Sequence, residues 1–238
     1  MAHGGSRDKT KVRIHRAYDQ LKTAYREFKE SHLEMIFRMA LMAEYRDPAT
    51  GVHLVRMADY SAILAGGMGL EPAEIEIIRY ASPMHDIGKI VLPDSILKKE
   101  GKLTDEEREI IQAHPEVGSQ IFKLSKSPIM KACGVIALSH HERFDGTGYP
   151  GGLKGAQIPL YGRIVGLADC FDALTSKRPY KEAFDFDVSV GMIIENAVTH
   201  FDPSVVMAFA RNKDKIRAIW EANRDIEDFL EKEMERRK

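Results

Sequence analysis

The sequence is poor in cysteine, with only Cys133 and Cys170 among its 238 residues. Two cysteines are too few for the disulfide framework of a small secreted protein, and they favour a reducing compartment. The sequence also lacks an apolar run approaching the roughly 18–20 residues that a helix needs to cross a bilayer. We therefore expect a cytoplasmic protein without a membrane span.

An excess of charge of one sign is also missing, because 35 basic residues stand against 36 acidic ones. The formal net charge of −1 excludes a broad cationic surface for a nucleic acid polymer, although it allows a local basic pocket. A chain of this length can bury a sizeable core. The composition therefore predicts one large domain, alone or with an appendage.

Strand patterns are absent as well, and the sequence predicts an all-α fold. Helix-starting signals recur along the chain: proline follows Glu71 and Ser127, and Thr104 with Glu107 forms a capping box. The glycine-rich range 146–162 predicts a long loop. Helices are expected at 53–68, 72–85, 105–114, 128–140, 161–175 and 187–198, and from 203 to the end.

These helices divide the chain into three expected segments. Residues 1–32 begin with MAHGGSRDKTK, which resembles a tag, and continue as a linker and dimerisation helix. A helix cut near its start suggests a further domain upstream in the natural protein. Residues 33–220 form the main helical domain, and residues 221–238 form a charged helical tail.

A helix is expected over residues 8–46, which contain neither proline nor glycine. Its apolar positions repeat with a period of 3.5 residues, which is typical of a coiled-coil seam. We expect the first part of this stripe to form a homodimer and the last part to pack on the chain's own domain. The first part is Ile14, Tyr18, Leu21, Tyr25 and Phe28, and the last part is Met35, Met39 and Met42.

Histidines gather near the ends of the expected helices, and two of them have a chemically useful neighbour. Asp86 follows His85 directly, and His141 follows His140. A lone histidine is more often a core or surface residue than a ligand, but a set of five with an adjacent carboxylate indicates a metal site. Imidazole and carboxylate without thiolate suit manganese, iron, zinc or nickel. The five histidines are His53, His85, His114, His140 and His141.

Three runs of residues carry a resemblance to a known family. Residues 85–89 read His-Asp-Ile-Gly-Lys, and residues 140–150 read His-His-Glu-Arg-Phe-Asp-Gly-Thr-Gly-Tyr-Pro. Downstream, residues 169–175 read Asp-Cys-Phe-Asp-Ala-Leu-Thr, and residues 178–181 read Arg-Pro-Tyr-Lys. Together these runs resemble the HD-GYP family of the HD phosphohydrolase superfamily, over roughly residues 40–220.

The resemblance implies an HD-domain helical bundle that hydrolyses cyclic di-GMP to linear pGpG and, by a further cleavage, to GMP. It also implies two divalent metal ions per chain, with iron or manganese favoured over zinc or nickel. Asp86 would bridge them, because a carboxylate has two oxygens that can reach two cations. One ion would be held by His53, His85, Asp86 and Asp169, and the other by Asp86, His114, His140 and His141.

Further roles follow from the same resemblance. Asp86 and Lys89 would be catalytic, with Lys89 at the scissile phosphate rather than a solvated surface lysine. Arg178 and Lys181 would hold substrate phosphates, which suits the planar fork of arginine. Tyr149 would be a structural plug or part of the substrate rim. Asp145 and Asp172 are interpreted as organisers of a loop and a helix, not as ligands.

Two alternatives to an active cyclic di-GMP phosphodiesterase stay open. The chain could be a weakly active or inactive module that binds cyclic dinucleotides, or a phosphodiesterase for another cyclic dinucleotide. The loop that contains Gly148, Tyr149 and Pro150 is called the GYP loop below. The resemblance also suggests a contact between this loop and a diguanylate cyclase (GGDEF) domain.

The number of metal ions is predicted from one missing carboxylate. Some relatives of the family carry a glutamate four residues before the first histidine and assemble a third metal. Here that position is Ala49, four residues before His53, so two ions are expected. Glu44 is nearby in sequence, but it belongs to the preceding helix, and it is not expected to replace the missing ligand.

Overall fold

The computed structural model describes residues 4–44, 51–99, 101–177 and 182–223. These ranges form helices joined by short turns and loops, together with one isolated bridge between Ala197 and Phe201 and no strand. The all-α prediction is confirmed for the described residues. None of the helices in these ranges is long and apolar enough to cross a membrane.

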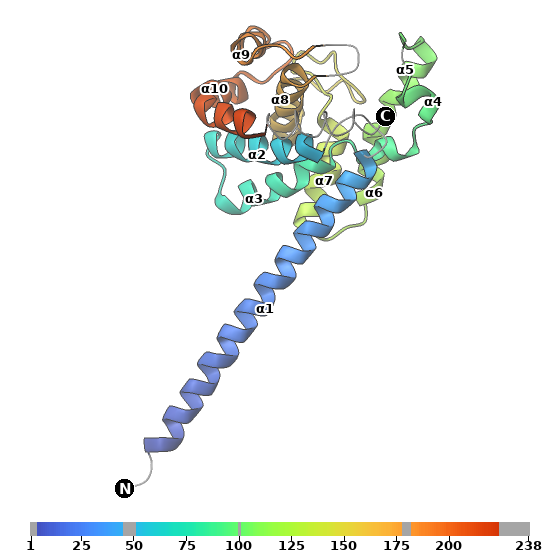
Figure 1. The fold of residues 1–238 in the computed structure, drawn as a ribbon. Helices are drawn as coiled ribbons and strands as arrows, with labels where there is room; N and C mark the ends of the chain where they lie inside the picture. The colour runs from blue at the N-terminus through green and yellow to red at the C-terminus, as the bar shows by residue number, and fades with distance from the viewer. Residues whose placement is uncertain (1–3, 45–50, 100, 178–181, 224–238) are drawn as a thin grey trace, which may run out of the picture.

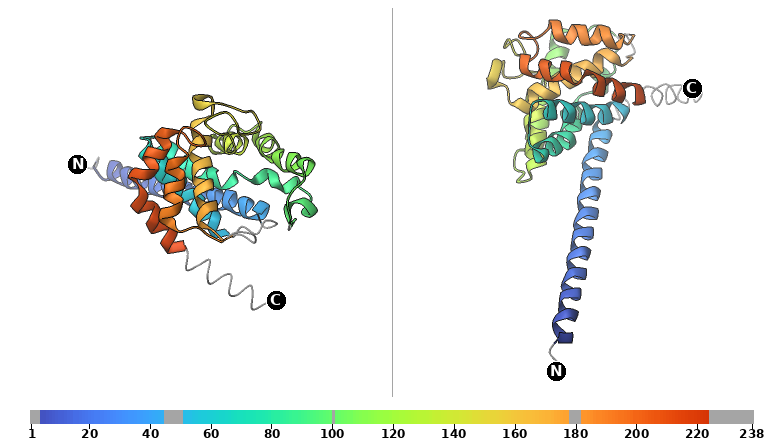
Figure 2. Two further views of the ribbon diagram at one scale, coloured as in Figure 1. Left: turned by 90° about the horizontal axis from the view of Figure 1, so that it is seen from above. Right: turned by 90° about the vertical axis from the view of Figure 1, so that its left-hand side faces the viewer.

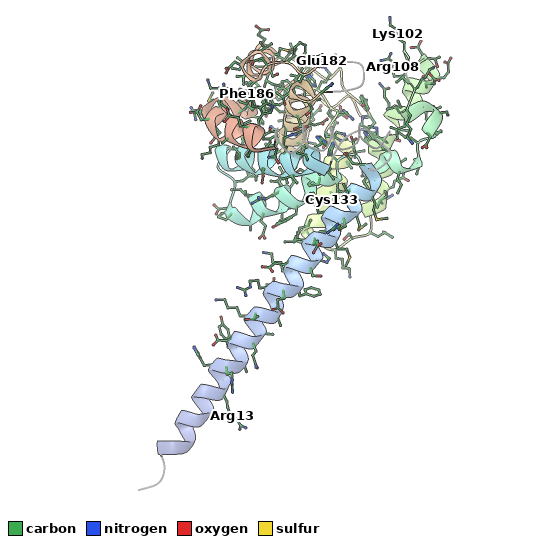
Figure 3. All side chains as sticks on the ribbon, viewed as in Figure 1. Arg13, Lys102, Arg108, Cys133, Glu182 and Phe186 are labelled. Atoms are coloured by element: carbon green, nitrogen blue, oxygen red, sulfur yellow. The ribbon has the colours of Figure 1, made fainter. Side chains whose placement is uncertain are left out.

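Helix α1, Gly4–Glu44, is a 41-residue rod whose first half projects away from the rest of the molecule (Figure 1). Figure 2 shows the same rod from two further directions, with the N-terminus at its far end. The side chains from Arg13 onward have no other described segment of the chain beside them until the rod reaches the body (Figure 3). Ile14, Leu21 and Phe28 are accordingly 64–71% exposed.

The last third of α1 packs on the body, but with a different face of the helix from the one that the sequence predicted. Met35, Met39 and Met42 were expected to pack on the domain, but they are exposed, so this prediction is wrong. The buried positions belong to a neighbouring helical face, where small residues allow closer approach. They are Leu33, Ile36, Ala40 and Ala43.

Four helices surround the main core. Helix α2 (Gly51–Gly67) packs on α3 (Pro72–Ala81) and α8 (Leu160–Thr175), and α7 (Pro128–Ser139) packs on α3 and α8. Their facing side chains are almost all aliphatic, with Phe171 at the centre. The fully buried members include Leu54, Met57, Leu64, Ile78, Ile136, Ile164 and Leu167.

The expected helix 72–85 is shorter than predicted. Helix α3 ends at Ala81, and two 3₁₀ turns follow, η1 (Ser82–Met84) and η2 (Ile87–Val91). Pro83 explains the change, because a proline has no N–H to continue the α-helical ladder. The tighter turns place His85 and Asp86 between two short helical segments rather than on a continuous helix.

The segment after η2 carries three more helices, α4 (Asp94–Leu97), α5 (Asp105–Gln112) and α6 (His114–Phe122). The predicted capping box is confirmed: the Glu107 N–H donates to Thr104 Oγ1 at 3.2 Å, and the Thr104 N–H donates to Glu107 Oε2 at 2.8 Å. Because α6 begins at His114, this histidine lies in its first turn.

The C-terminal helices complete the bundle by packing on α8 (Figure 2). The long loop before α8 contains the 3₁₀ turn η3 (Gly155–Gln157). After α8, helices α9 (Phe186–Glu195) and α10 (Pro203–Arg211) pack back on α8. The ring of Phe171 contacts those of Phe186 and Phe209, with centroids 5.5 and 5.0 Å apart. Residues 213–223 are again helical.

Candidate metal centre

The structure brings all seven predicted metal ligands together at the junction of five segments. His53 comes from α2, the adjacent His85 and Asp86 from the turns after α3, and Asp169 from α8. The remaining ligands come from the start of α6 and the end of α7, and they are His114, His140 and His141.

Two glycines allow these segments to approach closely. A Cβ atom on Gly88 would lie 2.0 Å from the carbonyl oxygen of His114, so only glycine lets η2 rest on the start of α6. A Cβ atom on Gly166 would lie 2.5 Å from the carbonyl oxygen of His140, where α8 crosses the end of α7. Backbone contact at these two points sets the distances between the ligands.

One cluster consists of Asp86, His114, His140 and His141, whose ligand atoms all lie within 4.8 Å of one another. Oδ1 of Asp86 is 3.1 Å from Nε2 of His114 and 3.5 Å from Nε2 of His140. All but His141 are buried, and His141 is half-buried. This cluster is the set predicted for the second ion.

A second cluster consists of Glu44, His53 and His85, again with ligand atoms within 4.8 Å of one another. Nε2 of His85 also lies 3.8 Å from Oδ1 of Asp169 and 3.4 Å from Oδ2 of Asp86. The Glu44 side chain was not expected here. It reaches the cluster because α1 runs into the body and ends beside α2, so Glu44 lies closer to His53 than its place in the sequence indicated.

Backbone carbonyls orient three of the histidine rings. Nδ1 of His85 bonds to the Ser82 carbonyl at 2.9 Å, and Nδ1 of His114 bonds to the Ile111 carbonyl at 2.7 Å. Nδ1 of His140 lies 3.0 Å from the Ala137 carbonyl. A carbonyl only accepts, so each Nδ1 carries a proton, and Nε2 is the ring nitrogen that faces the centre and could bind a cation.

A side-chain carboxylate orients the fourth ring. Nδ1 of His53 lies 2.7 Å from Oδ2 of Asp172. Arg56 holds Asp172 in turn, with Nε donating to Oδ1 at 2.5 Å and Nη2 donating to Oδ2 at 3.0 Å. Metal-binding histidines usually donate their other ring N–H to a carboxylate, a backbone carbonyl or water. The interpretation of Asp172 as an organiser is consistent with these contacts, but no sequence motif pointed to Arg56.

The unsatisfied atoms of the centre fit a metal ion. Nε2 of His85, His114 and His140, and Oδ1 of Asp86, are buried without a hydrogen-bond partner in the part of the chain that the structure describes. Buried polar atoms are rarely left in this state. Divalent cations would satisfy these atoms, and imidazole with carboxylate is a suitable ligand set.

Electrostatics also favour a cation. Burial opposes a charge on His85, but the Asp86 and Asp169 carboxylates outweigh it and raise the pKa of His85 to about 10. Burial alone would raise the pKa of Asp86, yet the nearby Lys89 ammonium and the imidazoles around the carboxylate hold it well below its usual value. The carboxylate is therefore ionised, and positive charge is stabilised beside it.

Comparison with known protein families finds a match to this chain. A model described as HD domain matches residues 38–205, which is more than half of the chain.

The chain belongs to the HD domain family.

Relatives and a solved structure agree with this assignment. The chain is 42% identical over 200 residues to the cyclic di-GMP phosphodiesterase response regulator RpfG of Xanthomonas campestris, covering 84% of this chain and 53% of the relative. It is 40% identical over 193 residues to 3′3′-cGAMP-specific phosphodiesterase 2 of Vibrio cholerae, covering 81% of this chain and 37% of the relative. The chain thus spans about half, or less, of these relatives.

The solved structure is that of a cyclic GMP-AMP specific phosphodiesterase of Vibrio cholerae, V-cGAP3. It superposes with a TM-score of 0.56 at 18% identity, over 78% of this chain and 49% of that one. This likeness concerns the fold, and it shows that the helical arrangement is shared.

Lys89 of this HD domain lies at the edge of the cluster. Its Nζ is 2.6 Å from Oδ2 of Asp86, and its side chain is 21% exposed. A purely solvated lysine would not make this contact. The ammonium group therefore contacts the centre while part of the side chain stays exposed to solvent.

The GYP loop of the HD domain covers the His141 side of the centre. The ring of Tyr149 stacks on His141, with centroids 4.7 Å apart. Glu142 is buried and folds the loop back by accepting hydrogen bonds from the N–H groups of Gly151 and Leu153, at 2.7 and 2.9 Å. Tyr149 thus packs against the His141 ring, and its role in binding substrate stays a prediction.

Asp145 organises the same loop. Its Oδ1 accepts hydrogen bonds from the N–H and the hydroxyl of Thr147, at 2.9 and 2.6 Å. This contact agrees with the interpretation of Asp145 as a loop organiser. Arg178 and Lys181, the predicted phosphate-binding residues, lie outside the described residues.

Proposed function

We propose that this HD domain is a metal-dependent phosphodiesterase that hydrolyses cyclic di-GMP to linear pGpG and, by a further cleavage, to GMP in bacterial second-messenger signalling. The observation that carries the proposal is the position of Asp86 between two sets of histidines. Its Oδ1 faces His114 and His140, and its Oδ2 faces His85. The names of relatives such as RpfG support the substrate class.

The residues that would hold the metal ions are those that meet at Asp86. We propose one divalent ion at His53, His85, Asp86 and Asp169, and a second at Asp86, His114, His140 and His141. Iron or manganese suits these ligands best, and zinc or nickel are alternatives. When bound, such a pair of cations activates a water molecule and neutralises charge on the phosphoryl group.

The chain's own residues bind and orient the substrate. Lys89 is placed beside Asp86 and would stabilise the negative charge that develops on the scissile phosphate. Tyr149 forms part of the rim against which a base or ribose can pack. Arg178 and Lys181 are proposed to bind the phosphates, as the family resemblance implies. Neither serine nor cysteine is required as a nucleophile.

A second substrate has support of its own. One relative at 40% identity is named as specific for 3′3′-cGAMP, so a cyclic GMP-AMP phosphodiesterase is the alternative that a specific observation favours. The bases of the two substrates differ, whereas their phosphodiester bonds do not. The metal centre would therefore serve both, and the pocket walls would choose between them.

The deciding experiment is turnover of a panel of cyclic dinucleotides by the chain loaded with Mn(II) or Fe(II) under anaerobic conditions. Cyclic di-GMP, 3′3′-cGAMP and cyclic di-AMP would be compared at equal concentration. We expect fastest hydrolysis of cyclic di-GMP, with pGpG as the first product. Faster hydrolysis of 3′3′-cGAMP would favour the alternative, and no hydrolysis by fully loaded protein would contradict the proposal.

The expected domain organisation and partners belong to the same proposal. Residues 33–220 would be the catalytic domain, residues 1–32 a tag and dimerisation helix, and residues 221–238 a charged tail. The exposed stripe of α1 would pair with the same stripe of a second copy. The contact between the GYP loop and a diguanylate cyclase domain stays a prediction.

A further inference from the structure

The side chain of Glu44 is buried at the candidate metal centre, and one of its two oxygens lacks a hydrogen bond in the described part of the chain. The residue is 5% exposed, and its Oε2 has no hydrogen-bond partner among the described residues. Within the same ranges no lysine or arginine forms an ion pair with Glu44. A carboxylate buried in this way is costly unless it is paired or bound to a cation.

The neighbours of Glu44 indicate what the partner is. A carboxylate oxygen of Glu44 and one ring nitrogen each of His53 and His85 lie within 4.8 Å of one another. Nδ1 of His53 is engaged by Asp172, and Nδ1 of His85 by the Ser82 carbonyl, so Nε2 is the free nitrogen of each ring. One acidic oxygen and two imidazole lone pairs around a common point form a cation site.

The charges at the centre leave a role for this carboxylate. Two divalent cations would bring four positive charges, and Asp86 and Asp169 supply only two negative ones. Lys89 adds a further positive charge beside Asp86. Asp172, which bonds to Nδ1 of His53, is already paired with Arg56, whereas a Glu44 carboxylate oxygen lies within 4.8 Å of a ring nitrogen of both His53 and His85.

We propose that Glu44 is a ligand of the metal ion held by His53 and His85, supplying from the end of α1 the charge that Ala49 lacks. The inference rests on the proposed metal-dependent function and adds a ligand to it. Because Glu44 is the last residue of α1, it also ties that long helix directly to the centre.

The test measures Mn(II) bound by the full chain, together with thermal stability. Glu44→Gln keeps the shape of the side chain and removes its charge. We expect wild-type protein to retain two Mn(II) ions per chain after gel filtration, and Glu44→Gln to bind one of them at least about tenfold more weakly. Mn(II) should also raise the Tm of the variant less than that of the wild type.

Glu34→Gln is the matched control, because Glu34 lies on the exposed face of the same helix and pairs only with Arg38, at 3.0 Å. It should bind Mn(II) like the wild type. Glu44→Leu serves as a second variant, filling the space with apolar atoms, and it should show the same loss as Glu44→Gln.

Unchanged Mn(II) binding in both folded Glu44 variants would overturn the inference while leaving the phosphodiesterase proposal in place. A wild-type chain that neither binds Mn(II) nor hydrolyses cyclic dinucleotides would instead overturn the proposed function, and the inference with it.

Discussion

The centre depends on single hydrogen bonds that fix the histidine rings. Each of His53, His85, His114 and His140 uses Nδ1 for a local partner and turns Nε2 inward. Three of these partners are backbone carbonyls, which a mutation cannot remove easily. The fourth is Asp172, so the orientation of His53 is the one that a side-chain substitution can test.

Asp172→Asn should weaken binding of the ion at His53 by about 10–100-fold, because an amide orients the ring less firmly and leaves Arg56 without its charged partner. The site at His114 should keep its affinity. Mn(II) titration monitored by electron paramagnetic resonance separates the two sites. If the variant binds Mn(II) at the His53 site with the same affinity as the wild type, Asp172 has no positioning role.

Asp202 is a second residue whose charge has a measurable effect. Its Oδ1 accepts the Ser204 N–H at 2.7 Å as the cap of α10, and its Oδ2 pairs with Arg163 of α8. Burial would raise the pKa of Asp202, but the Ser204 and Arg163 hydrogen bonds outweigh it and lower the pKa. Its stabilising effect is therefore present above the ordinary aspartate pKa and is lost as the pH falls through the lowered value.

Asp202→Asn keeps a capping oxygen and removes the charge. We expect it to reduce the free energy of unfolding by about 1–3 kcal/mol at pH 7. The difference from the wild type should shrink as the pH falls below about 4. Urea unfolding at a series of pH values measures this, and a pH-independent difference would argue against the ion pair.

At the scale of elements, backbone contact between η2 and α6 holds Asp86 against His114. Gly88→Ala would place a Cβ atom 2.0 Å from the His114 carbonyl, so η2 must move. We expect a loss of about 1–3 kcal/mol in stability and a lower metal content.

Gly191→Ala, in α9, is the control for Gly88→Ala, because its Cβ atom would meet nothing within 4 Å. Alanine is the better helix former, so this variant should unfold at an equal or higher temperature with a normal metal content. Calorimetry and elemental analysis on both variants decide the point. A normal metal content in Gly88→Ala would mean that this contact does not set the centre's geometry.

Helix α1 exposes an apolar stripe that no described segment of the chain covers. Because Met35, Met39 and Met42 are exposed too, the stripe runs from Ile14 to Met42. Leu21→Glu with Tyr25→Glu should convert a dimer to a monomer, since like charges would face each other across the seam. Light scattering measures the mass.

Lys22→Glu, on another exposed face of α1, should leave the dimer intact. A monomeric wild-type chain, or a dimer that survives the double substitution, would show that the stripe is not the interface.

At the scale of the whole molecule, the motifs predicted which residues meet at the centre, whereas the apolar pattern did not predict which face of α1 is buried. Each of the runs 85–89 and 140–150 contains two adjacent candidate ligands, so the sequence alone was enough to select these residues. Glu44 could not be selected, because its place depends on how α1 enters the body. The buried face of α1 was missed for the same reason, since small residues such as Ala40 and Ala43 give little hydrophobic signal.

The central claim is that two metal ions share Asp86 and hydrolyse a cyclic dinucleotide. The most direct test is Asp86→Ala, with metal content and cyclic di-GMP turnover measured on the same anaerobic sample. We predict that hydrolysis is abolished and that metal is lost from both positions, because one carboxylate serves both. Near-normal turnover, or a full metal content, in Asp86→Ala would contradict the account.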